Sequence, residues 1–413
     1  MKFVAMALIF IAMGLTSTAK TIRLKTNRDL QGQMTTKNAT YLVEKEFNLK
    51  GGNITVPSGC VLKFKKGVLR NGTITGNGTR IKAGKKQLFD AVEISGTWDN
   101  DTVYSEWLGF RQDSAYDNRV HFTNLTTLST GKRHTHIYMQ RGTFWTSIRK
   151  EGAGFSIPSN TTFHSLATIR EIANEYKAGK LIAIFKVENV VVDGGRYIGD
   201  LDTHIGEEGE WSHGIECRAS KNVTIKNVEV REFWGDGVDV IDGYDDNLKP
   251  TLNCYNVRLE NVKSYYNRRA GIGLEAVINC KVINCESKYT GQRRGTLPMT
   301  GIGIEAWSNE NEKLKNIVVE NCVFSDNKES DLFVYANGPW RDNFTLYEND
   351  IKVRNCSIGY FYVSHTNAII LEDCTISKSK GYEYQYVKGL QYNNCTLKGK
   401  KINNRITNLP KKK

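Results

Sequence analysis

The feature that most constrains the fold is a short pattern that returns at least seven times in the second half of the chain. Each copy begins with Asn or another turn-forming residue, alternates apolar residues over the next positions, and ends on Asn or Asp followed by Cys or Val. The copies are NVTIKNV from Asn222, NVRLENV from Asn256, NCKVINC from Asn279, NIVVENC from Asn316, DIKVRNC from Asp350, AIILEDC from Ala368 and GLQYNNC from Gly389. Alternation indicates a strand, and Asn indicates a turn.

The spacing of these copies predicts a solenoid. Their starts lie roughly 20 to 37 residues apart, which is the range typical of stacked structural repeats. One short strand per repeat cannot bury its apolar face alone, so successive coils must stack on one another. The sequence therefore predicts an all-β chain that forms a right-handed parallel β-helix, with short helical or loop excursions.

The first 19 residues, MKFVAMALIFIAMGLTSTA, have the pattern of a secretory signal peptide. A Lys precedes an apolar core, and small residues stand at Ser17 and Ala19, so cleavage before Lys20 is expected. No Cys follows the apolar core and no later stretch is apolar for 18 residues. We therefore expect an exported monomer, periplasmic or extracellular, with no membrane anchor.

The charge balance favours an acidic partner. The formal net charge is +13 at pH 7, and a strongly basic exported protein suits a uronate or sulfated polysaccharide. The chain shows no nucleic-acid motif, so we expect no nucleic acid among its partners. The alternative explanation for the positive charge is that the Lys residues lie in solvent-facing turns and bind no partner.

The nine Cys do not follow a disulfide pattern. Five of them occupy the repeat slot that Val228 and Val262 fill in other copies, namely Cys285, Cys322, Cys356, Cys374 and Cys395. Interchange with Val indicates a small, buried, apolar position. We predict a column of reduced thiols about 4.8 Å apart, and no metal site there, because no His joins the column.

The chain divides into five expected segments. These are the signal peptide 1–19, N-terminal coils and cap 20–110, a segment with short helices 111–181, the regular β-helix 182–400, and a frayed basic tail 401–413. Within the third segment, residues 118–130 have a weak helical period, and residues 165–179 are expected to form a second short helix or a long loop.

The stretches YSEWLGF, DNRVHFTNLTTLS and HIYMQRGTFWTS resemble the start of pectate-lyase-superfamily β-helix proteins. Those proteins carry an EWFGA-type turn, an Asp-rich loop, a helix, and a strand that ends in a PxGTY-like turn. Here Leu108 and Phe110 replace the usual pair, and Arg141–Gly142 stands where Pro-x-Gly is common. Many members are polysaccharide lyases or glycoside hydrolases and some are non-catalytic, so the resemblance implies a glycan ligand without choosing the reaction.

Each coil has a second strand before the Asn-marked one, and these strands share an acidic outward face. They read HGIECRA from His213, DGVDVID from Asp236, AGIGLEA from Ala270, TGIGIEA from Thr300 and SDLFVYA from Ser330. Alternation sends Ile215, Cys217, Val238, Val240, Ile272, Leu274, Ile302 and Ile304 inward. The outward face carries Glu216, Asp239, Glu275, Glu305 and Tyr335, with Arg218 beside them. Stacked acids repel, so this column is either functional or paired with cations.

The turns that lead into these strands supply Arg and aromatic residues. Arg suits carboxylates or sulfates, and aromatic rings stack on sugar rings. The predicted substrate-binding residues are His204, Trp211, Arg218, Trp234, Tyr266, Arg268, Arg293 and Tyr335. A structural Arg–Glu network on a solvated face is the alternative.

A long excursion, GDLDTHIGEEGEWSHGIE from Gly199 to Glu216, is dense in acids, His and Trp. Such loops on a solenoid usually build the binding site. His204 and His213 are candidate acid–base groups because imidazole titrates near neutrality. A structural role for His204 and His213, and turn chemistry for Asp236, are the alternatives.

Three functions fit these residues. The first is a lyase that cuts an acidic polysaccharide by β-elimination, with Arg269 and Arg294 neutralising the substrate carboxylate. Ca²⁺ would be held by Asp239, Glu275 and Glu305. The resemblance implies an Arg or Lys base, but the very high pKa of Arg leaves His213 or a nearby Tyr as rival bases.

The second function is a glycoside hydrolase that uses two of the carboxylates of Asp236, Asp239 and Glu275. The Asp-Asp doublet typical of β-helix polygalacturonases is missing from GDGVDV, and Asp245–Asp246 is expected in a loop. The third function is a non-catalytic glycan-binding β-helix. The concentration of His and acids between residues 199 and 242 argues against it.

Overall fold

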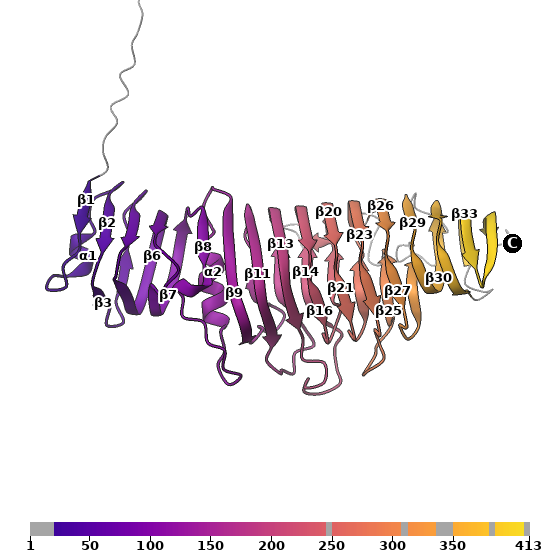
Figure 1. Ribbon diagram of the computed structural model, residues 1–413, viewed down its shortest axis with the longest axis horizontal. Coiled ribbons are helices and arrows are strands. Elements are labelled where there is room, and N and C mark those ends of the chain that lie inside the picture. The colour runs from indigo at the N-terminus through magenta and orange to yellow at the C-terminus, as the bar shows by residue number, and fades with distance from the viewer. Residues whose placement is uncertain (1–19, 245–249, 307–312, 336–349, 380–384, 409–413) are drawn as a thin grey trace, which may run out of the picture.

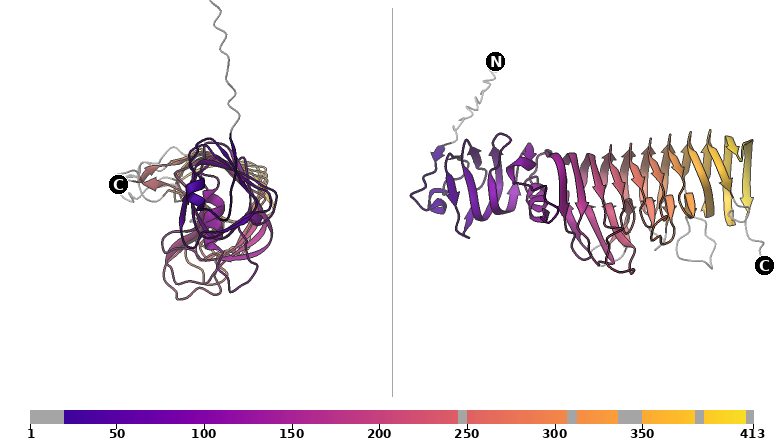
Figure 2. Two further views of the ribbon diagram at one scale, coloured as in Figure 1. Left: turned by 90° about the vertical axis from the view of Figure 1, so that its left-hand side faces the viewer. Right: turned by 60° about the horizontal axis from the view of Figure 1, so that its bottom comes forward.

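The computed structural model describes residues 20–244, 250–306, 313–335, 350–379 and 385–408. The expected signal peptide, the Asp245–Asp246 doublet and residues 409–413 of the expected tail lie outside the described residues. The coils stack along one long axis, from the N-terminal strands at one end to β33 at the other (Figure 1). Viewed along that axis they superpose, with the longer loops projecting beyond the coils (Figure 2).

The first coils form a seven-stranded sheet, and helices accompany the N-terminal half. The strands are β1 (Thr21–Arg23), β2 (Thr40–Val43), β3 (Glu46–Asn48), β4 (Asn53–Thr55), β5 (Val61–Phe64), β6 (Val68–Lys82) and β7 (Phe89–Trp98). The helices are α1 (Leu30–Gln33), the short 3-10 helix η1 (Ser105–Trp107) and α2 (Arg119–Thr127).

A parallel ladder of 25 strands continues the solenoid, and its final pairing is antiparallel. Its first part holds β8 (Thr102–Tyr104), β9 (Thr135–Thr146), β10 (Ala153–Ser156), β11 (Thr161–Glu171), β12 (Ala178–Phe185), β13 (Glu188–Ile198), β14 (Trp211–Arg218), β15 (Lys221–Lys226), β16 (Glu229–Arg231) and β17 (Val238–Ile241). Next come β20 (Cys254–Glu260), β21 (Lys263–Tyr265), β22 (Ala270–Leu274), β23 (Val277–Ile283), β24 (Glu286–Lys288), β25 (Thr300–Glu305), β26 (Leu314–Glu320), β27 (Val323–Ser325) and β28 (Ser330–Tyr335). The last are β29 (Ile351–Arg354), β30 (Ser357–Asn367), β31 (Ile369–Glu372), β32 (Thr375–Ser379), β33 (Gln385–Leu397) and β34 (Lys400–Asn408), while β18 (Gly243–Tyr244) and β19 (Pro250–Leu252) form a separate hairpin.

One face of the solenoid, which we call the groove face, positions the site described below. It is built by β12, β14, β17, β22, β25, β28 and part of β30, each paired in parallel with the next. The side chains expected to point inward from these strands are fully buried, as predicted: Ile215, Cys217, Val238, Val240, Ile272, Leu274, Ile302 and Ile304. The right-handed parallel β-helix predicted from the repeats is therefore the fold of this chain.

The repeated Asn residues act at the turns where each Asn-marked strand begins and ends. Asn222 and Asn227 both have positive φ angles, of 54° and 57°, a conformation that Asn tolerates better than most residues. The side-chain amide of Asn256 donates to Asn222 over 2.9 Å, and Asn279 donates to Asn256 over 3.0 Å. The repeat thus encodes both the turn and a hydrogen bond between neighbouring coils.

The cysteine column is also as predicted. All nine Cys are buried and free, and the backbone N–H groups of Cys285 and Cys322 each lie 3.4 Å from the Sγ of the next Cys in the column. The thiols of Cys285, Cys322, Cys356, Cys374 and Cys395 therefore fill the same interior slot in successive coils.

Cys356→Val should leave the fold almost unchanged, because Val228 and Val262 fill the same slot elsewhere and are just as buried. We expect the free energy of unfolding to change by less than about 1.5 kcal/mol, measured by urea denaturation. Cys356→Asp, which places a charge in the same slot, serves as the disruptive control. A large loss for the Val variant would show that the thiol itself is needed.

Two segments differ from the sequence-based expectation. The sequence favours a helix or a long loop over residues 165–179, but most of them belong to β11 and the start of β12. The reason is a period of two: Phe163, Ala167 and Ile169 are buried in alternation with exposed or half-buried neighbours. Much of the expected tail is strand β34, which pairs antiparallel with β33 and covers the last coil.

The helix expected within residues 118–130 is present as α2. Phe122 of this helix stacks on Phe155 of β10 with ring centroids 4.6 Å apart, and Asn124 donates its amide to the Val92 carbonyl of β7 over 2.8 Å. The helix thus links the seven-stranded sheet to the longer ladder. Among the described residues, no helix has the length and apolarity needed to cross a membrane.

Candidate functional site

A groove of about 830 Å³ lies along the groove face. Its lining runs from Ala178 and Lys180 on β12 to Tyr362 on β30. The strands between them belong to successive coils, each about 4.8 Å from the next. The groove is therefore elongated parallel to the solenoid axis, as a site for a polymer would be.

The wall of the groove is formed by two loops that are joined to each other. The excursion loop (residues 199–210) precedes β14, and a second loop (residues 289–299) precedes β25. Arg294 of the second loop donates to the carbonyls of Leu201 and His204 over 3.0 and 3.1 Å. The rim carries two exposed apolar side chains, Trp211 (54% exposed) and Leu297 (68% exposed).

Trp234 is the fully buried centre of this loop junction. His204 stacks on its indole ring at 4.0 Å, and the guanidinium carbons of Arg268 and Arg294 lie 3.6 and 4.3 Å from the ring centroid. The indole nitrogen donates to the Glu208 carbonyl over 3.2 Å. These contacts hold the excursion loop against the coils, because aromatic and cation–π packing is directional.

The register of the groove face arranges the predicted acids in two columns. Glu216 is in register with Asp239, and Asp239 is in register with Gly273. Glu275 follows β22 two residues after Gly273, and continuation of the β22–β25 register aligns it with Glu305. The single acidic column expected from the sequence is therefore two adjacent columns on the same face.

Gly273 leaves space beside the carboxylate of Asp239. A Cβ atom at this position would lie 3.0 Å from Asp239 Oδ1 and 3.3 Å from Asp236 Oδ2. In register with it on the next coil is Gly303. Two stacked glycines thus leave the column next to Asp239 without side chains on two successive coils.

Asp239 is fully buried, and neither carboxyl oxygen has a hydrogen-bond partner among the described residues. Burial and the nearby Glu275 carboxylate raise the pKa of Asp239 well above its ordinary value. A carboxyl group that lines the groove and holds its proton more tightly than an ordinary Asp is suited to act as a general acid.

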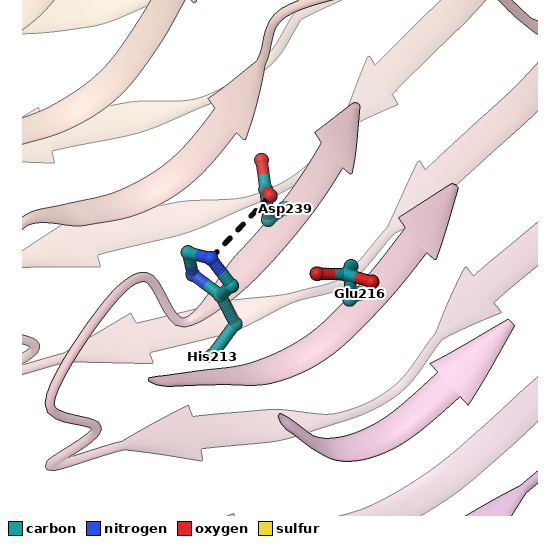
Figure 3. Close-up of side chains that lie close together, drawn as sticks. All are labelled: His213, Glu216 and Asp239. Carbon is teal, nitrogen blue, oxygen red and sulfur yellow. Dashed lines mark ion pairs between the residues drawn. The ribbon is translucent and has the colours of Figure 1, made fainter. Parts of the chain in front are cut away.

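Glu216 lies on the coil next to that of Asp239, but its pKa is shifted in the opposite direction. Its carboxylate accepts from Lys180 over 3.1 Å and from the Arg218 side chain over 3.1 Å. Burial favours the neutral form of Glu216, but Arg218, His213 and Lys180 together outweigh burial and lower the pKa. Figure 3 shows Glu216 on the strand of His213, next to the strand of Asp239.

His213 is held with its Nδ1 atom as an acceptor. The backbone N–H of Asp236 donates to Nδ1 over 3.0 Å, so in the neutral ring the proton resides on Nε2. Burial lowers the pKa of His213, although Asp236 and Glu216 oppose this change. Nε2 lies 3.7 Å from Asp239 Oδ2 (Figure 3), so His213 faces the groove as a donor.

Arg269 is enclosed by carboxylates. Its Nη1 atom lies 2.8 Å from Asp236 Oδ2 and 3.5 Å from Glu275 Oε1, and its Nη2 atom lies 3.8 Å from Glu305 Oε1. Burial opposes its charge, but these three carboxylates outweigh burial and raise the pKa of Arg269. Arg269 therefore stays charged and balances the acids around Asp239.

Most of the predicted site residues separate into two groups, and three others lie outside both. The groove brings together His213, Asp239, Arg269, Glu275, Arg218 and Trp211, with Asp236 behind them. His204, Trp234, Arg268, Arg293 and Arg294 belong to the loop junction instead. Tyr266 stacks on Tyr289 and lies near Arg293, Glu305 contacts Arg269 from behind, and Tyr335 stacks on Phe333 beside the groove.

Several lining residues are not evident from the sequence. Lys180 pairs with Glu216 from the preceding coil, and Phe333 stacks on Tyr362 at 5.1 Å. The role of Lys180 follows from the register of β12 and β14, which the sequence does not reveal because it favours a helix or loop up to the start of β12. Phe333 and Tyr362 are in register on neighbouring coils, and both point outward because residues alternate between the two faces of a strand. This alternation is the sequence pattern from which both residues could have been predicted to line the groove.

Comparison with known proteins supports the fold. Residues 213–408 match the family described as "Right handed beta helix region". Two curated proteins of Bacillus subtilis (strain 168) are similar. The uncharacterized protein YclG is 23% identical over 241 residues, covering 54% of this chain and 41% of YclG. The SPbeta prophage-derived uncharacterized protein YorA is 26% identical over 233 residues, covering 50% of this chain and 39% of YorA. The matched stretches thus span about two fifths of these relatives.

Solved structures overlap with this chain only loosely. The mannuronan C-5 epimerase AlgE6 A-module of Azotobacter vinelandii has 14% identity and a TM-score of 0.46, covering 75% of this chain and 100% of that chain. The bacteriophage phi29 gene product 12 N-terminal fragment has 15% identity and a TM-score of 0.47, covering 71% and 57%. The exopolygalacturonase of Thermotoga maritima has 13% identity and a TM-score of 0.38, covering 90% and 86%. Such overlaps assign no reaction or substrate. The coil register, with which the match over residues 213–408 agrees, shows that the chain has the right-handed parallel β-helix fold.

Proposed function

We propose that the groove hydrolyses glycosidic bonds of a polysaccharide, with Asp239 as general acid and Glu216 as the ionised partner. The observation that carries this proposal is one pair of carboxyl groups on adjacent coils whose pKa values are shifted in opposite directions. Carboxyl pairs whose environments separate their pKa values are the typical acid and base of glycosidases.

The distance between the two groups supports a retaining mechanism. One oxygen of Glu216 and one of Asp239 lie within 4.8 Å of each other. Retaining glycosidases hold their carboxyl groups about 5 to 5.5 Å apart, whereas inverting enzymes need about 6.5 to 9.5 Å to admit a water molecule. This close approach of one oxygen from each group favours the retaining arrangement.

The proposed reaction has two steps. Asp239 donates its proton to the leaving glycosidic oxygen while Glu216 attacks the anomeric carbon, which forms a glycosyl ester on Glu216 and releases the first sugar chain. Asp239, now ionised, then takes a proton from water, and the hydroxide oxygen replaces Glu216 at the anomeric carbon. Lys180 and Arg218 keep Glu216 ionised between turnovers.

The rest of the groove is suited to a sugar polymer. Trp211 at the rim and the stacked rings of Phe333 and Tyr362 provide apolar faces of the kind that sugar rings pack against. They lie several coils apart, so a bound chain would run along the solenoid axis. We further propose that the enzyme acts after export, on the basis of the signal peptide expected at residues 1–19.

The groups expected to serve β-elimination are already engaged in other contacts. The Nδ1 lone pair of His213, which a base would need, accepts the Asp236 N–H. Arg269 has a raised pKa and three carboxylate neighbours, so it is poorly placed to accept a proton or to neutralise a substrate carboxylate. Arg294 binds the carbonyls of the excursion loop. These contacts favour hydrolysis over elimination.

Calcium-assisted elimination is the second candidate function. Oxygens of Asp236, Asp239 and Glu275 lie within 4.8 Å of one another, and Asp239 has two oxygens without hydrogen-bond partners among the described residues. Carboxylate oxygens are what Ca²⁺ prefers, but it takes about six to eight oxygen ligands. Arg269 already contacts two of these three carboxylates, so an ion would compete with it. The predicted ligand Glu305 contacts the other terminal nitrogen of Arg269.

Lys180→Met should move the acidic limb of the pH–rate profile to higher pH. The limb reports the ionisation of Glu216, and removal of the Lys180 charge lets burial raise the pKa of Glu216. The alkaline limb, which reports the loss of the Asp239 proton, should move little. The measurement is kcat/KM against pH for parent and variant. An unchanged acidic limb would remove Glu216 from the proposed mechanism.

The proposed function is tested by incubating the protein with pectins, alginate, glycosaminoglycans and neutral plant polysaccharides, with and without a chelator. New reducing ends without ultraviolet absorbance, unaffected by the chelator, are expected. Rising absorbance that the chelator abolishes would replace hydrolysis by calcium-assisted elimination. Reducing ends that persist at the same rate in Asp239→Asn would show that the cleavage arises elsewhere.

A further inference from the structure

The groove does not account for the strong positive charge of this chain. Around Asp239, the cations Lys180, Arg218 and Arg269 are matched by a larger number of carboxylates. The N-terminal coils differ, because residues 20–110 contain nearly twice as many basic as acidic side chains. The net charge of +13 therefore has a clear local source in the N-terminal coils, at the end of the solenoid where β1 lies (Figure 1).

Basic side chains stack on the outward face of the seven-stranded sheet. Lys63 on β5 is in register with Lys82 on β6, and both are exposed. Three residues further along each of these two coils come Lys66 and Lys85, also exposed. Like charges that face each other on adjacent strands destabilise a sheet, so this arrangement is costly unless an anion lies across it.

No acidic neighbour compensates these four lysines within the described part of the chain. Glu44 pairs instead with Arg23 over 2.8 Å and with Lys65 over 3.0 Å. Lys63, Lys66, Lys82 and Lys85 form no ion pair with any described residue. Their charges are therefore available to a ligand.

An aromatic row continues the basic column toward the middle of the solenoid. The Lys85 ammonium lies 4.9 Å from the ring centroid of Tyr104 on β8. Tyr104 stacks on Tyr138 of β9 at 5.6 Å, and Tyr138 stacks on His164 of β11 at 4.8 Å. Tyr138 is 40% exposed. These aromatic residues share the face of the Asn-marked strands rather than the groove face.

We propose that this N-terminal strip, defined as Lys63, Lys66, Lys82, Lys85, Tyr104 and Tyr138, binds a linear anionic polysaccharide. Charges repeated at one coil spacing, about 4.8 Å, suit a chain with regularly spaced carboxylates or sulfates. The exposed ring of Tyr138 adds an apolar contact for a sugar. The choice of a glycan as the polyanion rests on the proposed function of the groove, whereas the charge argument is independent of it.

The strip would hold a polymer on a different face of the same solenoid as the groove, without taking part in cleavage. Binding a chain at two places on one rigid solenoid raises the local concentration of its remaining segments. The effect should be largest at low ionic strength, because exposed charges are screened beyond about 10 Å at 0.1 M salt.

The test uses Lys63→Glu/Lys82→Glu and two probes, dextran sulfate and polygalacturonate, titrated at low salt. We expect binding to weaken by at least on the order of tenfold, and raising the salt concentration should erase the difference from the parent. Lys281→Glu/Lys352→Glu is the matched control. These lysines are also exposed, lie on one outward column of the far coils, and give the same change in net charge.

The outcomes separate this inference from the proposed function. Asp239→Asn should bind both probes as the parent does, whether or not the parent cleaves anything. Lys63→Gln/Lys82→Gln, with an unchanged thermal melt, should reproduce most of the loss and exclude misfolding as its cause. Equal binding by the Lys63→Glu/Lys82→Glu variant and the parent would overturn the proposal that the N-terminal strip binds the polysaccharide. An equal loss of binding in the control variant would overturn it too. If the parent binds a DNA duplex or phosphatidylserine vesicles more tightly than it binds the two glycan probes, and Lys63→Glu/Lys82→Glu loses that binding, the choice of a glycan as the ligand would be overturned.

Discussion

Asp239→Asn should remove nearly all turnover and at the same time stabilise the protein. The buried carboxyl group is the proposed proton donor, and loss of a general acid typically costs about 10² to 10⁴ in rate. Because the pKa of this group is raised in the folded protein, the unfolded chain loses the proton more readily and the parent loses stability at neutral pH, a penalty that the non-ionisable amide removes. We expect a gain of about 1 to 3 kcal/mol in the free energy of unfolding at neutral pH.

The sign of this stability change depends on pH. The pKa of Asp239 is raised in the folded state, so the fold binds its proton more tightly than the unfolded chain does. The parent therefore loses stability as pH rises from the ordinary Asp range toward the raised pKa, whereas the Asn variant does not. Urea denaturation of both proteins across that window should show curves that separate with rising pH.

Glu216→Gln is the matched control for this prediction. It should lose turnover as severely, but its effect on stability should have the opposite sign. The pKa of Glu216 is lowered by Arg218, His213 and Lys180 against the effect of burial, so its ionised form stabilises the fold above the ordinary Glu range. Equal stability changes in the two variants would contradict the assignment of acid and ionised partner.

Trp234→Ala should cause the largest loss of stability of any substitution near the groove. Trp234 is fully buried and contacts His204, Arg268 and Arg294 at the junction of the two loops. Truncation of a buried Trp typically costs about 3 to 5 kcal/mol. The excursion loop should also become sensitive to protease, because it would lose the packing that holds it against the coils.

The catalytic consequences of this change should appear in substrate binding. Loosening the loops displaces the rim of the groove but leaves the register of Glu216 and Asp239 intact, so KM should rise while the pH–rate profile keeps its shape. Trp211→Ala is the control, because Trp211 is 54% exposed at the rim. It should raise KM with no change in unfolding free energy. A normal melt for Trp234→Ala would contradict the structural role of the junction.

The fold could be predicted because each repeat carries its own turn and core signals. Asn222 and Asn256 occupy positive-φ positions near the start of their Asn-marked strands, and one interior slot holds Val in some coils and Cys in others. Prediction failed for most of residues 165–179, for which the sequence favours a short helix or a long loop although the buried positions follow a period of two. It also failed at β34, because antiparallel pairing over the last coil breaks the repeat.

The site was predictable in composition but not in register. The sequence places Glu216 and Asp239 on one outward face, yet only the structure shows that Glu216 is in register with Asp239 and that Glu275 is not. The Arg doublets illustrate the same limit. Arg269 faces the groove, whereas the similarly placed Arg294 turns into the excursion loop, because local sequence does not determine the path of a long loop.

The most direct test of the central claim is the anomeric configuration of the first product, followed by proton NMR during cleavage of whichever polysaccharide is active. The spacing of Glu216 and Asp239 predicts that the new reducing end first appears with the configuration of the bond that was cut. An inverted anomer would contradict the assignment of Glu216 as nucleophile and Asp239 as general acid. An unsaturated end would show that the bond is broken by elimination instead.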